Sequence, residues 1–273
     1  MRRRFVARAS GIGAITVNLR EAKIEVMNGH RLDYESHRAA FERECGLIVD
    51  AIVDALELPV PTCPQWRVSD LAEHLVDVFT FWNSQLEAAS PGAQVASRSQ
   101  GATAGAEVVD RLEGARTALQ LALAAHDPED PCWNWAGEDL TADWVCRRMA
   151  LESAVHRYDL ELSVSSPTPI DRDLAVDGID EWIGVHLATD VPETPGISLG
   201  GVLCLACSDD SAAWTVEVVA GRLRWREGRG PADAVLVGSA SDLYLFGWNR
   251  RPLEVLELTG NRDVAAAWSS LTV

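Results

Sequence analysis

The chain has 273 residues, of which 47% are hydrophobic and 24% charged, and its net charge is −17. This composition is typical of a folded globular protein and excludes a disordered chain. Because so acidic a surface repels phosphate backbones, we expect no nucleic-acid partner. No apolar run approaches the roughly 20 residues that a membrane-spanning helix needs, so we expect no membrane span. At roughly 100–200 residues per domain, the length predicts two domains.

The first thirty residues differ from the remainder of the chain. Residues 1–8 are rich in arginine, and the apolar stretch at 11–17 is soon followed by Arg20, Glu21 and Lys23, with no small-residue cleavage site. This pattern is a poor match to a secretory signal peptide. We therefore expect residues 1–30 to be an N-terminal extension, either a disordered tail or an over-extended gene start.

Six cysteines are scattered along the chain, at positions 45, 63, 132, 146, 204 and 207. Without a secretion signal, this pattern predicts free thiols in a reducing compartment and hence a cytoplasmic protein. Cys204 and Cys207 form a CxxC pair, but they fall in an expected strand, where positions three apart point to opposite faces. Buried structural cysteines are therefore favoured over a metal-binding or redox pair.

Four helices are expected in the first part of the chain. Phe41, Cys45, Ile48 and Ile52 recur at helical spacing, and prolines at 59, 61 and 64 end that pattern. Ser69 is a suitable N-cap for the second helix. The expected helices are residues 32–58, 69–89, 106–126 and 141–162. Helices of this length with short connections predict a four-helix bundle over residues 31–165.

A segment rich in serine and proline, residues 163–169, is the expected domain boundary. Beyond it, a helix at about 173–189 precedes short alternating segments typical of strands. The expected strands are 201–208, 214–219, 223–226 and 234–237, and the expected closing helices are 241–248 and 263–271. We therefore predict an α+β protein, in which the bundle is followed by a smaller α+β domain, residues 170–273, with an antiparallel sheet.

Three side chains able to bind a metal are expected to point into the bundle. Glu152 and His156 lie at i and i+4 on an inward-facing stripe of the fourth helix, and His74 lies between two core leucines of the second. A buried carboxylate is unfavourable unless it is paired or metal-bound. Two interpretations are open: a hydrogen-bonded His–Glu cluster, or a divalent ion on two histidines and one carboxylate, as in catalytic zinc and non-haem iron sites.

Seven short segments carry a resemblance to a known family. They are residues 61–66 (PTCPQW), 68–75 (VSDLAEHL), 152–159 (ESAVHRYD), 167–170 (PTPI), 177–180 (DGID), 238–243 (GSASDL) and 248–252 (WNRRP). In this order they resemble the mycothiol-dependent maleylpyruvate isomerase family, over about residues 31–273. Gln65, Tyr158 and Asn249 stand where the family usually has glycine, tryptophan and glycine.

The resemblance implies a DinB-like metal-binding four-helix bundle followed by a C-terminal domain similar to sterol-carrier folds. The family's two histidines and one glutamate fall on His74, His156 and Glu152, which favours the metal interpretation and implies a divalent ion, zinc above all. The implied partners are a small-molecule substrate and a low-molecular-weight thiol, mycothiol.

The implied activity is that of a cis–trans isomerase of cis-enoyl diketo acids. A divalent ion deprotonates a coordinating thiol near neutral pH. Addition of the thiolate makes the conjugated double bond single, the bond rotates, and elimination returns the thiol with the trans isomer. Because the enolate formed on addition needs a cationic partner, Arg250 and Arg251 are candidate catalytic residues. Both are equally compatible with an exposed arginine pair on a loop.

Two further residues are candidates for supporting roles. Asp159 is expected to accept a hydrogen bond from His156, or else to cap the end of its helix. Arg148 lies one turn before Glu152 and competes with the arginine pair for the cationic role. The histidines at 30, 37, 126 and 186 show no evident partner and are expected at the surface.

Two other functions remain open. A mycothiol S-transferase would keep the thiol adduct of another electrophile and consume the thiol stoichiometrically. A non-catalytic protein would bind a metal or an apolar ligand without turnover.

Overall fold

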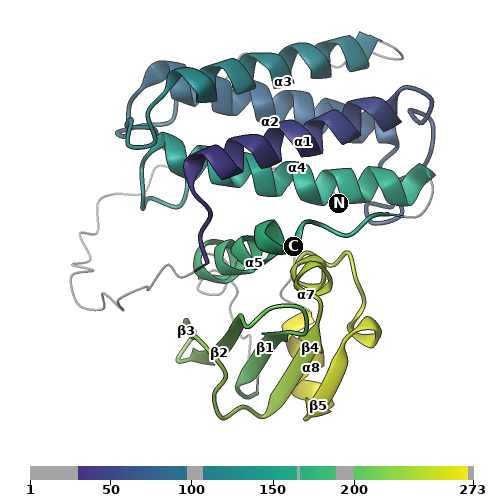
Figure 1. The fold of residues 1–273 in the computed structure, drawn as a ribbon, viewed down its shortest axis with the longest axis vertical. Coiled ribbons are helices and arrows are strands. Elements are labelled where there is room, and N and C mark those ends of the chain that lie inside the picture. Colours follow the sequence, from purple (N-terminus) through teal and green to yellow (C-terminus); the bar gives the residue numbers. More distant parts are fainter. Residues whose placement is uncertain (1–29, 97–106, 165–166, 189–199, 270–273) are drawn as a thin grey trace.

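The computed structural model describes residues 30–96, 107–164, 167–188 and 200–269, so the expected extension at 1–30 lies outside the described residues apart from His30. Four helices form the first part, close to the expected positions. They are α1 (Tyr34–Ile52), α2 (Val68–Ala88), α3 (Glu107–Ala125) and α4 (Ala142–Val164). The predicted helical N-terminal part is confirmed (Figure 1).

Local sequence explains where α1 begins and which face it buries. Asp33 caps its N-terminus by accepting a hydrogen bond from the backbone N–H of Ser36 at 2.8 Å. The predicted stripe of Phe41, Cys45 and Ile48 is buried in the core. The helix ends at Ile52, earlier than expected, because turns occupy the residues before the first proline.

Helix α4 is buried on nearly all sides, because it packs against α1 on one side and adjoins the C-terminal half on another. Its burial includes charged side chains, among them Arg148, Arg157 and Asp159. Buried charges need partners. The partners of these three come from several other elements, and they determine how the site is built.

The C-terminal half begins with α5 (Arg172–Glu181), which continues as a π-helix, η1 (Trp182–Leu187). The strands are β1 (Leu203–Cys207), β2 (Ala213–Val219), β3 (Arg222–Glu227), β4 (Ala234–Gly238) and β5 (Glu257–Gly260). The remaining elements are α7 (Ala240–Gly247), the 3-10 turn η2 (Leu253–Val255) and α8 (Arg262–Ser269). Four strands and the helices agree with expectation, whereas β5 and the π-helix were not predicted.

The sheet has the order β3-β2-β1-β4-β5, and it is not wholly antiparallel as predicted. Strand β1 pairs in parallel with β4, with Leu205 opposite Leu236, while the other three pairings are antiparallel. All five residues of β1 are buried, as is typical of a strand covered on both faces. Alternation in the sequence identifies strands but does not specify their neighbours, which is why the parallel pairing escaped prediction.

The six cysteines are free thiols, as the sequence analysis expected.

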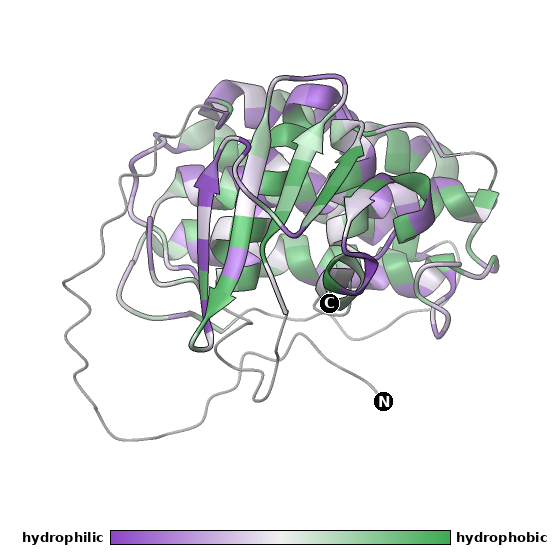
Figure 2. Ribbon diagram, turned by 90° about the horizontal axis from the view of Figure 1, so that it is seen from below, coloured by the Kyte–Doolittle hydropathy of each residue, from purple (hydrophilic) through white to green (hydrophobic). Residues whose placement is uncertain are grey.

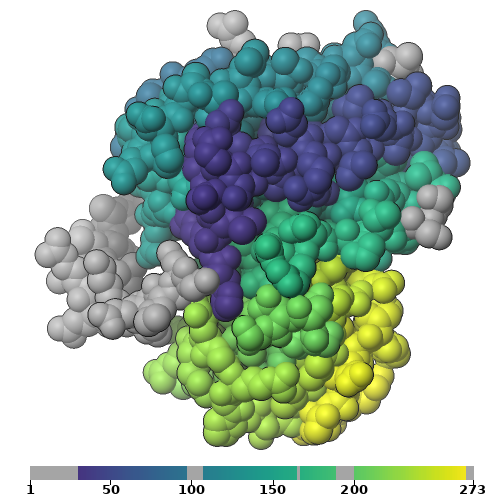
Figure 3. All heavy atoms as spheres, in the orientation of Figure 1, coloured from purple at the N-terminus to yellow at the C-terminus, as the bar shows by residue number. Residues whose placement is uncertain are grey.

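The elements form three layers, with α5 and α7 between the bundle and the sheet (Figure 1). The two halves are in contact across α4 (Figure 3). The edge strand β3, with sequence RLRWRE, is hydrophilic beside its more apolar neighbours (Figure 2), which discourages edge-to-edge pairing. Among the described residues, none of the helices has both the length and the apolar character that crossing a membrane requires.

Gly178 allows α5 to lie against α4 and α7. A Cβ at this position would lie 2.6 Å from the Tyr244 ring and 2.9 Å from a Leu151 methyl group. The ring of Tyr244 is itself fully buried and cannot move away easily. The absence of a side chain at Gly178 is therefore a packing requirement at the junction of the two halves.

We expect Gly178→Ala to lower the free energy of unfolding by roughly 1–3 kcal/mol, as overpacking of a core does. Gly114→Ala, in the exposed middle of α3 with no atom within 4 Å of the added Cβ, is the matched control. It should stabilise the protein by about 0.4–1 kcal/mol. Urea unfolding of both variants measures the difference. Equal effects of the two substitutions would contradict a close approach at Gly178.

Candidate metal centre

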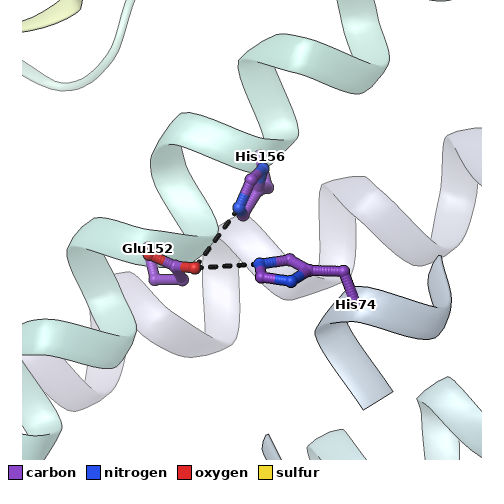
Figure 4. Close-up of side chains that lie close together, drawn as sticks. All are labelled: His74, Glu152 and His156. Carbon is purple, nitrogen blue, oxygen red and sulfur yellow. Dashed lines mark hydrogen bonds and ion pairs between the residues drawn. The ribbon is translucent and has the colours of Figure 1, made fainter. Parts of the chain in front are cut away.

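Three potential ligands converge from two helices, as the sequence predicted (Figure 4). His74 comes from α2, and Glu152 and His156 come from successive turns of α4. Their nearest donor atoms all lie within 4.8 Å of one another. The Oε1 atom of Glu152 is 3.2 Å from Nε2 of His74 and 3.3 Å from Nε2 of His156. All three side chains thus present a donor atom to one small volume.

The cluster lies at the edge of the core. The side chains of His74 and Glu152 are each 19% exposed, and that of His156 is 8% exposed. The indole of Trp66 packs beside both imidazoles, with ring centroids 5.1 Å and 6.4 Å away. The cluster is therefore partly accessible to solvent at His74 and Glu152.

Asp159 lies directly behind His156, in the position that the first of its two expected roles requires. Its Oδ2 is 3.0 Å from Nδ1 of His156. The same carboxylate accepts a hydrogen bond from the Thr62 hydroxyl at 2.6 Å and two from the Arg250 guanidinium at 3.0 and 3.1 Å. An Nδ1–H that donates to a carboxylate fixes the imidazole tautomer and leaves the Nε2 lone pair free for a metal.

Burial and hydrogen bonds act in opposite directions on the pKa values of the cluster. Burial alone would raise the pKa of Glu152, but hydrogen bonds from His156 and His74 hold that pKa well below its usual range. Burial would likewise lower the pKa of His156, whereas its hydrogen bonds to Asp159 and Glu152 raise it to about 9. An ionised carboxylate between two imidazoles attracts positive charge, which a proton or a divalent cation can supply.

The residues present fit a divalent ion. Two imidazoles and one carboxylate are the ligand set of many catalytic zinc sites. The second ring nitrogen of His156 has the carboxylate partner that metal-bound histidines commonly have. Three protein donors would leave coordination positions for a thiol or substrate. The role of these three residues as metal ligands stays a prediction.

Arg148 supports Glu152 from the other side. Its Nη2 donates to Oε2 of Glu152 at 2.9 Å, and its Nη1 donates to Glu181 of α5 and, at 3.0 Å, to Nε2 of His186. The guanidinium carbon also lies 5.4 Å from the ring centroid of Trp248. Arg148 therefore contacts a candidate ligand, as its predicted supporting role requires.

The two candidate catalytic arginines have different environments. Arg250 is 11% exposed and is paired with Asp159, which in turn contacts the candidate ligand His156. Arg251 is 38% exposed and donates to Asp242 at 2.8 Å. Arg250 thus contacts the residue behind His156, whereas Arg251 pairs with Asp242, which is not part of the cluster. A catalytic role for either residue remains a prediction.

Several buried residues were missed or misplaced by sequence reasoning. Glu181 was not singled out, although it follows Asp177 at i+4 and faces the same helix of the bundle. His186 and His37 were expected at the surface, but both are buried. His186 contacts Arg148 and the rings of Trp135 and Trp248, while Nε2 of His37 is 2.6 Å from the carboxylate of Asp177. Their partners are remote in sequence, so local patterns gave no signal.

Comparisons with known proteins give the same fold. The family model described as the mycothiol maleylpyruvate isomerase N-terminal domain matches residues 37–161. Crystal structures of a mycothiol-dependent maleylpyruvate isomerase and of a mutant of it match with a TM-score of 0.61, at 12% and 11% sequence identity. Each match covers 84% of this chain and 93% of the other. At such identities the likeness shows the fold alone. No curated protein sequence matches the chain.

Proposed function

We propose, from the match of residues 37–161 to the mycothiol maleylpyruvate isomerase N-terminal domain model, that the protein is a metal- and mycothiol-dependent isomerase of this family. Its substrate is a cis-enoyl diketo acid of the maleylpyruvate type. The observation that carries this proposal is the convergence of His74, Glu152 and His156 within 4.8 Å in that domain. The six free thiols fit a reducing compartment, and we place the enzyme in the cytoplasm.

A divalent ion, zinc by preference, would lower the pKa of a coordinating thiol and offer positive charge to an enolate. The protein's own residues hold the site in place. Asp159 keeps the proton of His156 on Nδ1, so that Nε2 faces the cluster. Arg148 fixes one oxygen of Glu152 and leaves the other toward the two histidines. Trp66 covers the imidazole rings beside the open side of the cluster.

One observation favours a second candidate, a mycothiol S-transferase acting on a neutral electrophile. The two arginines that lie nearest the cluster are already paired with buried carboxylates. Arg148 is shared by Glu152 and Glu181, and Arg250 makes two hydrogen bonds to Asp159. A dianionic diketo acid would have to compete with these carboxylates for the guanidinium groups, or else bind the metal ion without help from an arginine.

Thiol stoichiometry distinguishes the two reactions. Zinc-loaded protein should convert maleylpyruvate with mycothiol present in catalytic amounts, followed as a change in absorbance, and a chelator should stop the reaction. The isomerase returns its thiol after each turnover, whereas a transferase consumes one thiol per product. Conversion that consumes thiol stoichiometrically would support the second candidate. Protein that binds no metal and turns over neither class of substrate would overturn both, leaving a binding protein.

A further inference from the structure

Two of the three candidate ligands are supported by chains of buried charged residues that end in the C-terminal half. Both ligands, Glu152 and His156, are on α4. Each contacts a second charged residue of α4, and that residue contacts a partner outside the bundle. We call these chains the glutamate relay and the histidine relay.

The glutamate relay consists of Glu152, Arg148 and Glu181. Arg148 uses Nη2 on Glu152, at 2.9 Å, and Nη1 on Glu181 of α5. Arg148 is 4% exposed and Glu181 is 2% exposed, so water screens this pair little. His186 and Trp248 contact the same guanidinium. The C-terminal half therefore fixes the plane of Arg148, and through it the position of one oxygen of Glu152.

The histidine relay consists of His156, Asp159 and Arg250. Asp159 is fully buried and lies 3.0 Å from Nδ1 of His156. Arg250 follows α7 and donates to both oxygens of Asp159, at 3.0 and 3.1 Å. Its own Nη1 donates to the carbonyl of Trp248 at 2.7 Å, which orients the guanidinium. The rotation of the His156 ring is thus set from the C-terminal half as well.

His74 differs from the two α4 residues. Its described partners are Glu152, the ring of His156 and the ring of Trp66, all within the N-terminal part. Within the described parts of the chain, the C-terminal half therefore supports only the two candidate ligands on α4. It contacts Glu152 through Arg148 and His156 through Asp159.

We infer that the C-terminal half acts as a positioning device for the metal centre, with Glu181 and Arg250 as positioning residues that set Glu152 and His156 through Arg148 and Asp159. The inference rests on the proposed metal centre and adds a role for the second half. Residues behind metal ligands raise affinity because they fix the orientation of the ligands before the metal arrives. Here that contribution comes from a separate part of the fold.

The structure provides a matched control for this inference. Asp177 and Glu181 both lie on α5, are both buried, and pair with the neighbouring α4 residues Arg147 and Arg148. Arg147 donates to Asp177 at 2.6 Å but contacts none of the three candidate ligands. Both ion pairs connect the two halves of the protein, but of the two arginines only Arg148 also contacts Glu152. Asp177 also contacts His37 and the backbone N–H of Leu32, so a purely structural role would make its loss at least as damaging as the loss of Glu181.

The test measures zinc affinity of the full chain by competition with a chromogenic chelator, with folding checked by circular dichroism. We expect Glu181→Gln to weaken zinc binding by about tenfold, the lower end of the range for residues bonded directly to a ligand, and Asp177→Asn to change it by less than about threefold. Arg250→Leu should weaken binding to a similar extent, and Arg250→Lys should restore part of it. If Glu181→Gln does not fold, the shorter Glu181→Asp, which keeps the charge but misplaces it, takes its place with the same expected direction.

A double-mutant cycle separates positioning from general destabilisation. If Glu181 acts through Arg148, Glu181→Gln should have no further effect on zinc affinity in an Arg148→Met background. Equal effects of Glu181→Gln and Asp177→Asn, or unchanged affinity in both Glu181→Gln and Arg250→Leu, would overturn the relays and leave the proposed function standing. A wild-type chain that binds no zinc would overturn both.

Discussion

His156→Ala is expected to remove the metal ion and abolish thiol-dependent turnover while the protein stays folded. Loss of a residue behind a ligand already costs about 10–100-fold in metal affinity, so loss of the ligand itself should cost more. The fold should survive because Asp159, which loses its histidine partner, keeps the hydrogen bonds from Thr62 and Arg250. No buried carboxylate is left alone.

The measurements are zinc content by elemental analysis and the melting temperature of the metal-free protein. His126→Ala serves as the control, because His126 pairs with Asp130 at 2.9 Å outside the cluster. It should retain both zinc and activity. One zinc per chain in purified His156→Ala would show that the ligands have been assigned wrongly.

Arg157→Met should produce a large loss of stability. Arg157 is 2% exposed and donates to Glu44 of α1 at 2.8 Å and to Glu161 at 2.7 Å. It also donates to the hydroxyl and carbonyl of Thr168, in the segment that leads to the C-terminal half. Its removal leaves Glu44 buried beside one partly exposed arginine, Arg43. We expect a loss of about 3–5 kcal/mol in the free energy of unfolding.

Urea unfolding checks this expectation, with Arg38→Met as control. Arg38 pairs with the exposed Glu35 on the surface of α1, and such pairs contribute about 0–1 kcal/mol. A double variant, Arg157→Met with Glu44→Leu, should recover much of the loss, because replacing both members of a buried pair by apolar groups is often neutral. A loss below about 1 kcal/mol in the single variant would mean that water compensates Glu44.

The glutamate and histidine relays also bear on the arginine pair that the sequence put forward as catalytic. Sequence reasoning required a cation near the metal and found two in Arg250 and Arg251. In the structure, Arg250 neutralises Asp159, and Arg251 neutralises Asp242. A sequence motif does not show which carboxylate neutralises an arginine, because this depends on which acidic side chains the fold brings beside it.

The sequence alone was sufficient for the helical N-terminal part and for the identity of the cluster. Apolar spacing is a local property, and it located the four helices. The predicted cap of the second helix was wrong, because α2 begins at Val68 with Arg67 as its N-cap and Ser69 lies inside the helix. The i, i+4 spacing of Glu152 and His156 is also local, and it required both side chains to share one face of α4. The position of His74 on the core stripe of α2 then directed a third donor inward. Resemblance of short motifs linked these residues to a family whose domain model matches residues 37–161.

Only the tertiary structure decided how the second half meets the first. The parallel pairing of β1 with β4 and the burial of His37 and His186 depend on docking between distant segments. Glu181 lies 33 residues from Arg148, and Arg250 lies 91 residues from Asp159. No periodic pattern spans such separations, because a side chain finds these partners only after separate elements have packed. Local sequence therefore determined which residues form the cluster, and packing of the two halves determined which charged residues support them.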